Sequence, residues 1–299
     1  MTGVVGTYCI LMTGQIRIAI SIVAACAGCT APAAEPSTDA INQLTADYFA
    51  KRPSTSVHAG LNLAEARNSQ KAFVARLTPR LGPRVGFKVG LTSKAVQESV
   101  GASTPVRGVL LRDMMLKNNA KVSAEFGARP IWEPDFIVVV KDAGINRART
   151  PLEVAKHLSE AVAFIELPDR IVAETEKVDG NLITAINSSA RLGVLGQRVK
   201  IKATPEFLAA LEKMSVTATD QNGVELARAK GDALLGHPLN PVLWLIEDLA
   251  ATGEQLRAGD LLSLGSFAKP QPPRPGQTVT VRYDGLPGGP FQVSVKFAK

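Results

Sequence analysis

Three carboxylates in this 299-residue chain are spaced so that they could act together. Glu133 and Asp135 stand one residue apart in GARPIWEPDFIVVV, and Glu166 follows 31 residues after Asp135. Residues two apart on an extended chain point the same way, so the first pair would lie side by side. Like charges beside a buried apolar run need a compensating cation, which makes a metal site one interpretation. The alternative is that all three are ordinary charges facing solvent.

The ligand type limits which metal the three carboxylates could hold. An all-oxygen shell suits a hard divalent ion such as Mg²⁺ or Mn²⁺, and it suits zinc less well. If these residues converge, we therefore expect Mg²⁺ or Mn²⁺ at the site.

The elements around these residues decide whether they can meet. An apolar run directly after Asp135 predicts a strand. Thr150-Pro151-Leu152-Glu153 is a capping box with proline at the first helical position. Apolar residues at helical spacing follow it, namely Leu152, Ala155, Leu158, Val162 and Ile165. We therefore expect a helix from Thr150 to Ile165 whose C-terminal end brings Glu166 to the core.

Helices and strands are also expected at the two ends of the chain. Helical spacing over residues 40–78 predicts two helices separated by a turn at Lys51-Arg52-Pro53-Ser54, with Pro79 and Gly82-Pro83 ending this section. Another helix is expected to start at Asn240-Pro241 and to run to Gly253. Beyond it, LLSLGSF, TVTVRY and FQVSVKF read as strands joined by Pro/Gly turns.

Composition narrows the class of protein. The net charge is +7 and the pI is about 9.4, but the basic residues are scattered and only 5% of residues are aromatic. Without a basic stripe or a base-stacking platform, we interpret the charge as a solvated surface and expect no nucleic-acid partner. All cysteines, which are Cys9, Cys26 and Cys29, precede residue 30. The rest of the chain therefore has neither a disulfide framework nor a thiolate site.

The first residues predict export. In MTGQIRIAISIVAACAGC, Arg17 precedes an apolar run from Ile18 to Ala25 that is too short to span a bilayer comfortably. Small residues before Cys26 and Cys29 resemble a bacterial lipobox. We therefore expect one of these two cysteines to be lipidated and to become the N-terminal residue. The protein would then be periplasmic or anchored to a membrane through its lipid. Soluble export, with cleavage near residues 31–33, is the alternative.

The chain divides into three parts on this interpretation. Residues 1–33 form a leader and the start of a tether, residues 34–83 form a helical section, and residues 84–299 form the main domain. The Pro/Ala/Ser composition of residues 31–39 is typical of a flexible tether.

Several sequence blocks, in order, resemble the 2-keto-4-pentenoate hydratase branch of the fumarylacetoacetate hydrolase superfamily. They are GFKVGLTSKAVQESVGASTPVRGVLLRDMM, RPIWEPDFIVVV, AFIEL, INSSARLGVLG and GHPLNPVLWLIEDLAATGEQLRAGDLLSLGS, and the likeness covers residues 60–299. The fold that this resemblance implies is α+β, a fumarylacetoacetate hydrolase-like mixed β-sandwich roll with an N-terminal helical section. The resemblance also leads us to expect a homo-oligomer.

The resemblance assigns roles to individual residues. It implies that Glu133, Asp135 and Glu166 bind the metal, with Asp135 in place of the second glutamate of the family pattern. Lys88, in GFKVGLTSK, falls on the active-site lysine of the family, whereas without the family match a surface lysine is the simpler interpretation.

Roles for further residues rest on motifs that are less specific than those of the carboxylates and Lys88. The resemblance implies substrate contacts for Asn187, Ser188, Ser263 and Gly265, and Ile186 replaces an acid that is usual in the family. We interpret His237 as a structural turn residue, and Trp132 and Trp244 as core residues.

The activity implied is that of a metal-dependent hydratase in aromatic catabolism. It would add water to a 2-hydroxy-2,4-dienoate of the 2-oxopent-4-enoate type and give a 4-hydroxy-2-oxo acid. One alternative is a 2-oxo acid decarboxylase of the same family. Another is a non-catalytic lipoprotein that binds a small 2-oxo acid, which the leader and the substitutions at Asp135 and Ile186 favour.

Overall fold

A computed structural model describes residues 35–298, so the expected leader and all three cysteines lie outside the described residues. Within this range, a seven-stranded sheet has the strand order β2-β1-β10-β5-β6-β7-β3. Its strands are β1 (Arg84–Gly90), β2 (Val106–Leu111), β3 (Met115–Lys117), β5 (Glu133–Val140), β6 (Leu158–Leu167), β7 (Leu192–Lys200) and β10 (Leu261–Ser263).

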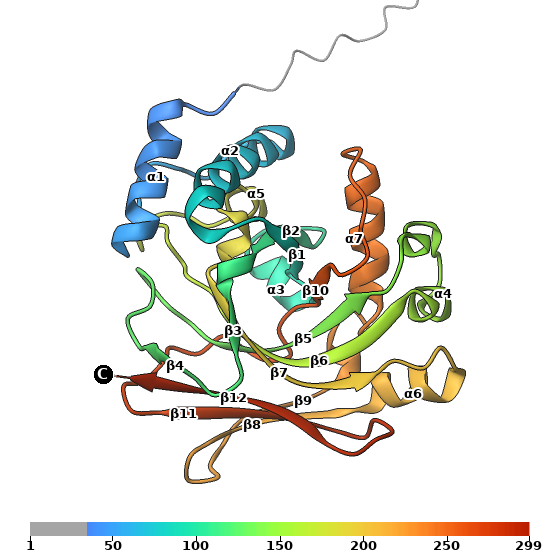
Figure 1. Cartoon of the computed structure of the whole chain (residues 1–299). Helices are drawn as coiled ribbons and strands as arrows, with labels where there is room; N and C mark the ends of the chain where they lie inside the picture. Colours follow the sequence, from blue (N-terminus) through green and yellow to red (C-terminus); the bar gives the residue numbers. More distant parts are fainter. Residues whose placement is uncertain (1–34, 299) are drawn as a thin grey trace, which may run out of the picture. The chain divides into compact units, whose positions relative to one another are not determined.

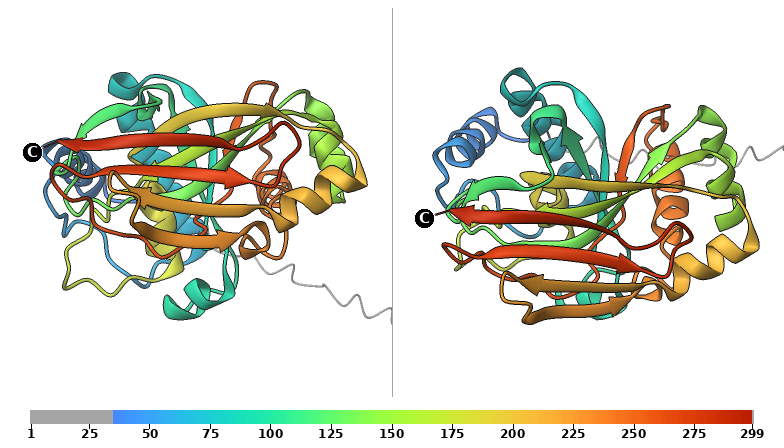
Figure 2. Two further views of the ribbon diagram at one scale, coloured as in Figure 1. Left: turned by 90° about the horizontal axis from the view of Figure 1, so that it is seen from below. Right: turned by 60° about the horizontal axis from the view of Figure 1, so that its bottom comes forward.

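A second, five-stranded sheet has the order β4-β12-β11-β8-β9. Its strands are β4 (Ala120–Ser123), β8 (Ser215–Asp220), β9 (Glu225–Lys230), β11 (Thr278–Asp284) and β12 (Phe291–Ala298). This sheet runs beneath β5, β6 and β7 (Figures 1 and 2). Alternate residues of β12 are buried between the sheets, as the alternating sequence predicts. The α+β sandwich expected from the sequence is confirmed.

The expected N-terminal helices are present as α1 (Thr38–Ala50) and α2 (Leu63–Leu81). Pro79 does not end the second helix, which continues to Leu81, because a proline so close to the end removes only one backbone hydrogen bond, and Gly82 N then donates to Thr78 O to close the last turn. Figure 1 shows α1, α2 and α5 (Gly180–Ala185) gathered on the side of β1 and β2. Leu44 and Phe73 of these helices share a buried cluster with Leu111 of β2. The helical section therefore packs on β2 through a buried cluster that is distinct from the larger one between the sheets.

The helix predicted from Thr150 to Ile165 is wrong. The capping box does start a helix, α4 (Pro151–Lys156), but Leu158–Leu167 forms strand β6. This strand lies between β5 and β7, and its second half is buried on both faces. A run that is apolar on both faces has no decisive period, and its valine and isoleucine favour the strand. Glu166 therefore lies on a strand and not at a helix end.

The last long helix is α7 (Asn240–Ala250), near its predicted position but ending at Ala250, with Asn240 as its first residue rather than its cap. The other helices are α3 (Lys94–Ser99), α6 (Pro205–Lys213) and the short 3-10 turns η1 (Arg112–Met114), η2 (Ala143–Arg147), η3 (Asn187–Ser189) and η4 (Gly231–Ala233). Among the described residues, no helix is both long enough and apolar enough to cross a membrane.

Candidate active site

Strand register brings two of the predicted carboxylates together. Glu133 at the start of β5 is directly opposite Glu166 near the end of β6 in an antiparallel pair. Opposite residues in such a pair project from the same face, with Cβ atoms roughly 5 Å apart. The two glutamates therefore meet across the sheet, and pairing between strands brings them together.

Lys88 of β1 joins this pair. Its side chain is only 5% exposed and forms an ion pair with Oε1 of Glu166. Its Nζ also donates a hydrogen bond of 2.8 Å to the carbonyl oxygen of Ser188. The interpretation of Lys88 as a surface residue is wrong, and the lysine reaches the carboxylates as the family resemblance implies.

The electrostatics of the site favour a further cation. Removal from water raises the pKa of Glu133 to about 8, with Glu166 adding to the rise and Lys88 opposing it. Burial likewise raises the pKa of Asp135 to about 7, with Glu166 adding to the rise and a hydrogen bond from Ser263 opposing it. Glu133 and Glu166 lie beside one buried ammonium group, that of Lys88, with the Asp135 carboxylate nearby, so a divalent ion would balance the remaining negative charge.

Asp135 is turned away from the facing glutamates. Its Oδ2 accepts a hydrogen bond from Ser263 Oγ, and its Oδ1 accepts from the backbone N–H groups of Leu264 (3.2 Å) and Gly265 (3.0 Å). Over residues 35–298, no three His, Cys, Asp or Glu side chains are grouped so that they could hold a metal ion. The structure thus pairs Glu133 with Glu166, and a three-carboxylate ligand set stays a prediction.

The segment Asn187-Ser188-Ser189 crosses β1 and β2 in an unusual conformation. These residues have φ values of 58°, 51° and 58°, a left-handed run that costs side chains with a Cβ of order 1 kcal/mol each. Asn187 holds the run in place, because its Oδ1 accepts from Val109 N (2.7 Å) and its Nδ2 donates to Val109 O (3.0 Å). The result is that the Ser188 carbonyl faces Lys88.

Close approach of this segment depends on glycine. A Cβ at Gly108 would lie 2.7 Å from Lys88 Cγ and 2.8 Å from the carbonyl oxygen of Asn187. Because the Asn187 amide is already used on β2, its contact with a substrate stays a prediction, as do those of Ser188, Ser263 and Gly265. Ile186, which replaces the usual acid, is buried in the cluster beneath the N-terminal helices.

Sequence reasoning missed two residues beside the carboxylates. Tyr283 of β11 is buried, and its hydroxyl donates to the carbonyl of Phe164 (3.0 Å) and also contacts the carbonyl of Asp135. It joins the second sheet to β5 and β6 behind the site. Exposed Arg170 lies close enough to lower the pKa of Glu133. The alternation of TVTVRY indicates that Tyr283 points inward, but no local pattern reveals its partners.

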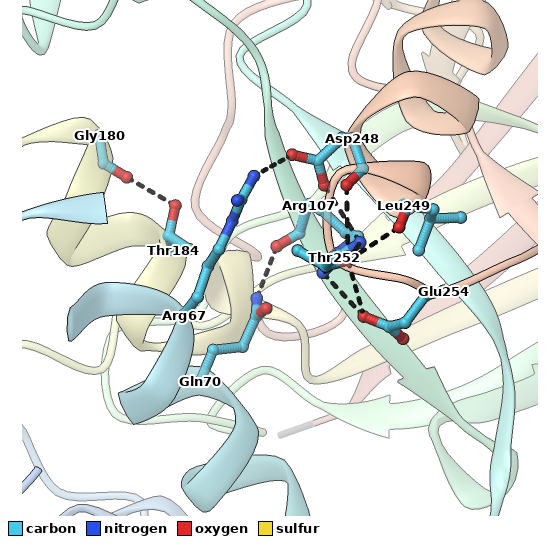
Figure 3. A network of polar contacts seen from close by, with 9 residues as sticks. All are labelled: Arg67, Gln70, Arg107, Gly180, Thr184, Asp248, Leu249, Thr252 and Glu254. Atoms are coloured by element: carbon cyan, nitrogen blue, oxygen red, sulfur yellow. Dashed lines mark hydrogen bonds and ion pairs between the residues drawn. The ribbon is translucent and has the colours of Figure 1, made fainter. Parts of the chain in front are cut away.

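A separate cavity of about 530 Å³ is lined by residues of α2, β2, α5 and α7. Figure 3 shows that three of its charged groups, Arg67, Arg107 and Asp248, contact one another. Arg107 is paired with Asp248 (3.1 Å) and Glu254 (3.0 Å), and Arg67 also contacts Asp248. We interpret this network as a structural connection between α7, α2 and β2.

The remaining sequence assignments concern residues of the core. Trp132 is fully buried, as predicted, whereas Trp244 is half-buried and lines this cavity. His237 has the structural role expected of it, since its Nδ1 accepts from Leu239 N (3.0 Å) and its Nε2 donates to Leu208 O (3.2 Å).

Known proteins share both this fold and this sequence. The 4-oxalocrotonate decarboxylase from Pseudomonas putida G7, solved with magnesium and adipate, aligns with a TM-score of 0.74 at 25% identity, over 87% of this chain and 96% of that chain. The TodF product hydratase of Pseudomonas putida is 31% identical over 236 residues, which is 78% of this chain and 81% of that protein. The 2-keto-4-pentenoate hydratase of Burkholderia vietnamiensis is 30% identical over 197 residues, or 66% and 72% of the two chains.

No protein-family model matches the chain. The similarity to the hydratases nevertheless extends over most of both sequences, and the fold agrees with it. The chain belongs to the 2-keto-4-pentenoate hydratase branch of the fumarylacetoacetate hydrolase superfamily.

Proposed function

We propose that this protein is a metal-dependent hydratase that adds water to a 2-hydroxy-2,4-dienoate and releases a 4-hydroxy-2-oxo acid. The observation that carries the proposal is the direct pairing of Glu133 with Glu166 beside buried Lys88. The similarity to two hydratases over at least two thirds of each of their lengths supports the same reaction.

The facing glutamates fit a hard divalent cation. Carboxylate oxygens are the ligands that Mg²⁺ and Mn²⁺ prefer, and within residues 35–298 no side chain donates a hydrogen bond to the Glu133 carboxylate. Glu133 and Glu166 would hold the ion, and we favour Mg²⁺ or Mn²⁺. When bound, the ion supplies a Lewis acid for the carboxylate and C2 oxygen of a 2-oxo acid.

The reaction needs two proton movements that the chain can assist. Ketonisation moves the proton of the C2 hydroxyl to C5, and hydration then places hydroxide on C4 and a proton on C3. Lys88 is fixed by Glu166 and by the Ser188 carbonyl, so its Nζ can orient the substrate carboxylate or pass a proton at a defined place. Positioning by buried contacts is the role that we assign to this lysine.

A decarboxylase of the same family is the second candidate. The likeness to the solved 4-oxalocrotonate decarboxylase, at 25% identity, is the observation that favours it. Loss of CO₂ from a 2-oxo acid would use the same enolate stabilisation, but the two reactions give products of different mass.

The test is turnover of 2-hydroxypenta-2,4-dienoate by the purified protein with Mg²⁺ or Mn²⁺, followed by absorbance and by mass spectrometry of the product. We expect addition of one water, loss of activity with a chelator, and loss of both activity and Mn²⁺ binding in Glu166→Gln. Release of CO₂ from an oxalocrotonate would favour the decarboxylase. Binding of a 2-oxo acid without turnover would overturn the proposal in favour of a binding protein.

A further inference from the structure

We propose that Asp135 is a positioning residue that fastens β10 to β5, and that the divalent ion is held by Glu133 and Glu166 without it. The inference rests on the proposed function, because it concerns how the proposed metal site is built. It departs from the three-carboxylate set that the sequence pattern predicts.

The first reason is that the Asp135 carboxylate is already used. Its side chain is fully buried, and both oxygens accept hydrogen bonds from the protein. The donors are the hydroxyl of Ser263 and the backbone N–H groups of Leu264, Gly265 and Phe136. A carboxylate has about four acceptor positions, so these contacts leave it little capacity for a metal.

The second reason is that β10 needs such an anchor. This strand has only three residues, Leu261–Ser263, yet it lies between β1 and β5 in the sheet. Ser263 is the register partner of Lys88 on one side and of Ile137 on the other. A short strand contributes few ladder hydrogen bonds, so the Asp135 contacts at its end help to set the distance between the strands that carry Lys88 and Glu133.

The third reason is the tight packing just after β10. Gly265 has a φ of 109°, and a Cβ added there would lie 2.1 Å from the Oγ1 of Thr92. The N–H of Gly265 donates to Asp135, so the same carboxylate holds this turn against the loop that follows β1. Asp135 therefore connects two segments that flank Lys88, which is what a positioning residue does.

The deciding experiment measures Mn²⁺ affinity of the full chain by calorimetry, with Asp135→Asn compared with Glu133→Gln and Glu166→Gln. Asparagine has the shape of aspartate, and its amide can keep the bonds to Ser263, Leu264 and Gly265 while removing the negative charge. We expect Asp135→Asn to change the Mn²⁺ dissociation constant by less than about threefold, and each glutamine variant to raise it by more than about tenfold.

A second measurement tests the anchor itself. Asp135→Ala and Ser263→Ala should be strongly non-additive in thermal unfolding, because each removes the same contact. Both single variants should raise the KM for the dienoate, whereas Asp135→Asn should keep the KM near that of the unaltered protein. If Asp135 only stabilised the fold, KM would not follow this pattern. Asp135→Glu, which restores the family residue, should lower stability and should not tighten Mn²⁺ binding.

The outcomes separate the two proposals. If Asp135→Asn loses Mn²⁺ as the glutamine variants do, or if Asp135→Glu tightens it, Asp135 is a ligand and this inference is wrong while the metal site stands. If the unaltered chain neither binds Mn²⁺ nor hydrates the dienoate, the proposed function is wrong. Additive effects of Asp135→Ala and Ser263→Ala would overturn the anchor whatever the metal result.

Discussion

Lys88 is a charged group held inside a sheet by two acceptors of different kinds. The carboxylate of Glu166 balances its charge, and the carbonyl of Ser188 fixes the direction of its Nζ. A buried ammonium is costly without such partners, so the left-handed backbone at residues 187–189 has a clear structural purpose. The strained backbone therefore fixes the position of the Lys88 ammonium group.

Replacing Lys88 by Met tests this role, since Met has a similar length but no donor. We expect turnover of the dienoate to fall by about 10²- to 10⁴-fold while Mn²⁺ binding persists, because the glutamates remain. Lys94→Met is the matched control, because Lys94 is exposed at the start of α3. An unchanged rate in Lys88→Met would contradict the assignment.

His237 gives a pH prediction at the residue scale. Its burial lowers its pKa, and its Nδ1 must remain unprotonated to accept from Leu239 N. In the unfolded chain histidine takes up a proton near pH 6.5, so the unfolded state binds more protons and stability falls as the pH drops below about 6.5. Thermal unfolding at pH 7.5 and pH 5.5 should show a smaller difference in His237→Gln than in the unaltered protein. An equal pH dependence in both proteins would be evidence against this role.

At the scale of elements, the pairing of β5 with β6 is supported from below by β11. Tyr283 carries this contact, since its hydroxyl reaches the backbone of both strands at the Asp135–Phe164 pair. That pair is the next same-face position after Glu133 and Glu166. The second sheet therefore stabilises the register on which the site depends.

Tyr283→Phe should lower the free energy of unfolding by about 1–3 kcal/mol, because the buried carbonyls of Asp135 and Phe164 lose the single hydroxyl donor that they share. Thr280→Val on the same strand removes a hydrogen bond to Ser294 that is only part-buried, so its cost should stay within about 1 kcal/mol. Urea unfolding of the two variants measures the difference. Equal losses would show that the Tyr283 hydroxyl has no special role.

The connection of α7 to β2 is a second feature at this scale (Figure 3). The Arg107 side chain is 8% exposed and depends on Asp248, whereas the Glu254 side chain is 48% exposed. We expect Asp248→Ala to destabilise the fold by about 3 kcal/mol, because it leaves a buried charge poorly paired. Glu254→Ala should cost less than about 1 kcal/mol. Chemical denaturation checks both values, and a larger loss in Glu254→Ala would contradict this account.

At the scale of the whole molecule, the helical section shares a buried cluster with β2 of the seven-stranded sheet, and this cluster contains Tyr48, Leu77 and Leu111. Residues so connected are expected to unfold together. The homo-oligomer expected from the family stays a prediction, which light scattering of the purified protein would test.

Export is the remaining prediction, and it concerns residues outside those that the structure describes. We propose that the mature chain starts at Cys26 or Cys29 and carries a lipid, because the segment before them has the order of a secretory leader. Mass spectrometry of the protein from membranes should find this modified terminus. Replacing both cysteines by serine should release the protein from the membrane fraction, and an unprocessed chain that retains Met12 would contradict the proposal.

Local sequence was sufficient for features that depend on neighbours along the chain. The capping box at Thr150 starts a helix, the alternating C-terminal segments form strands, and two amphipathic stretches form α1 and α2. The ordered sequence blocks also identified the family and pointed to Lys88. Caps, turns and alternation are set by contacts within a few residues, which is why they can be read directly.

Tertiary structure decided the features that depend on segments far apart. Leu158–Leu167 is a strand because β5 and β7 cover its edges, and the register between β5 and β6 places Glu133 opposite Glu166. The direction of the Asp135 side chain depends on donors about 130 residues away in β10 and its turn. Alternation along one strand determines which face a residue is on, but only the neighbouring strands determine what it contacts there.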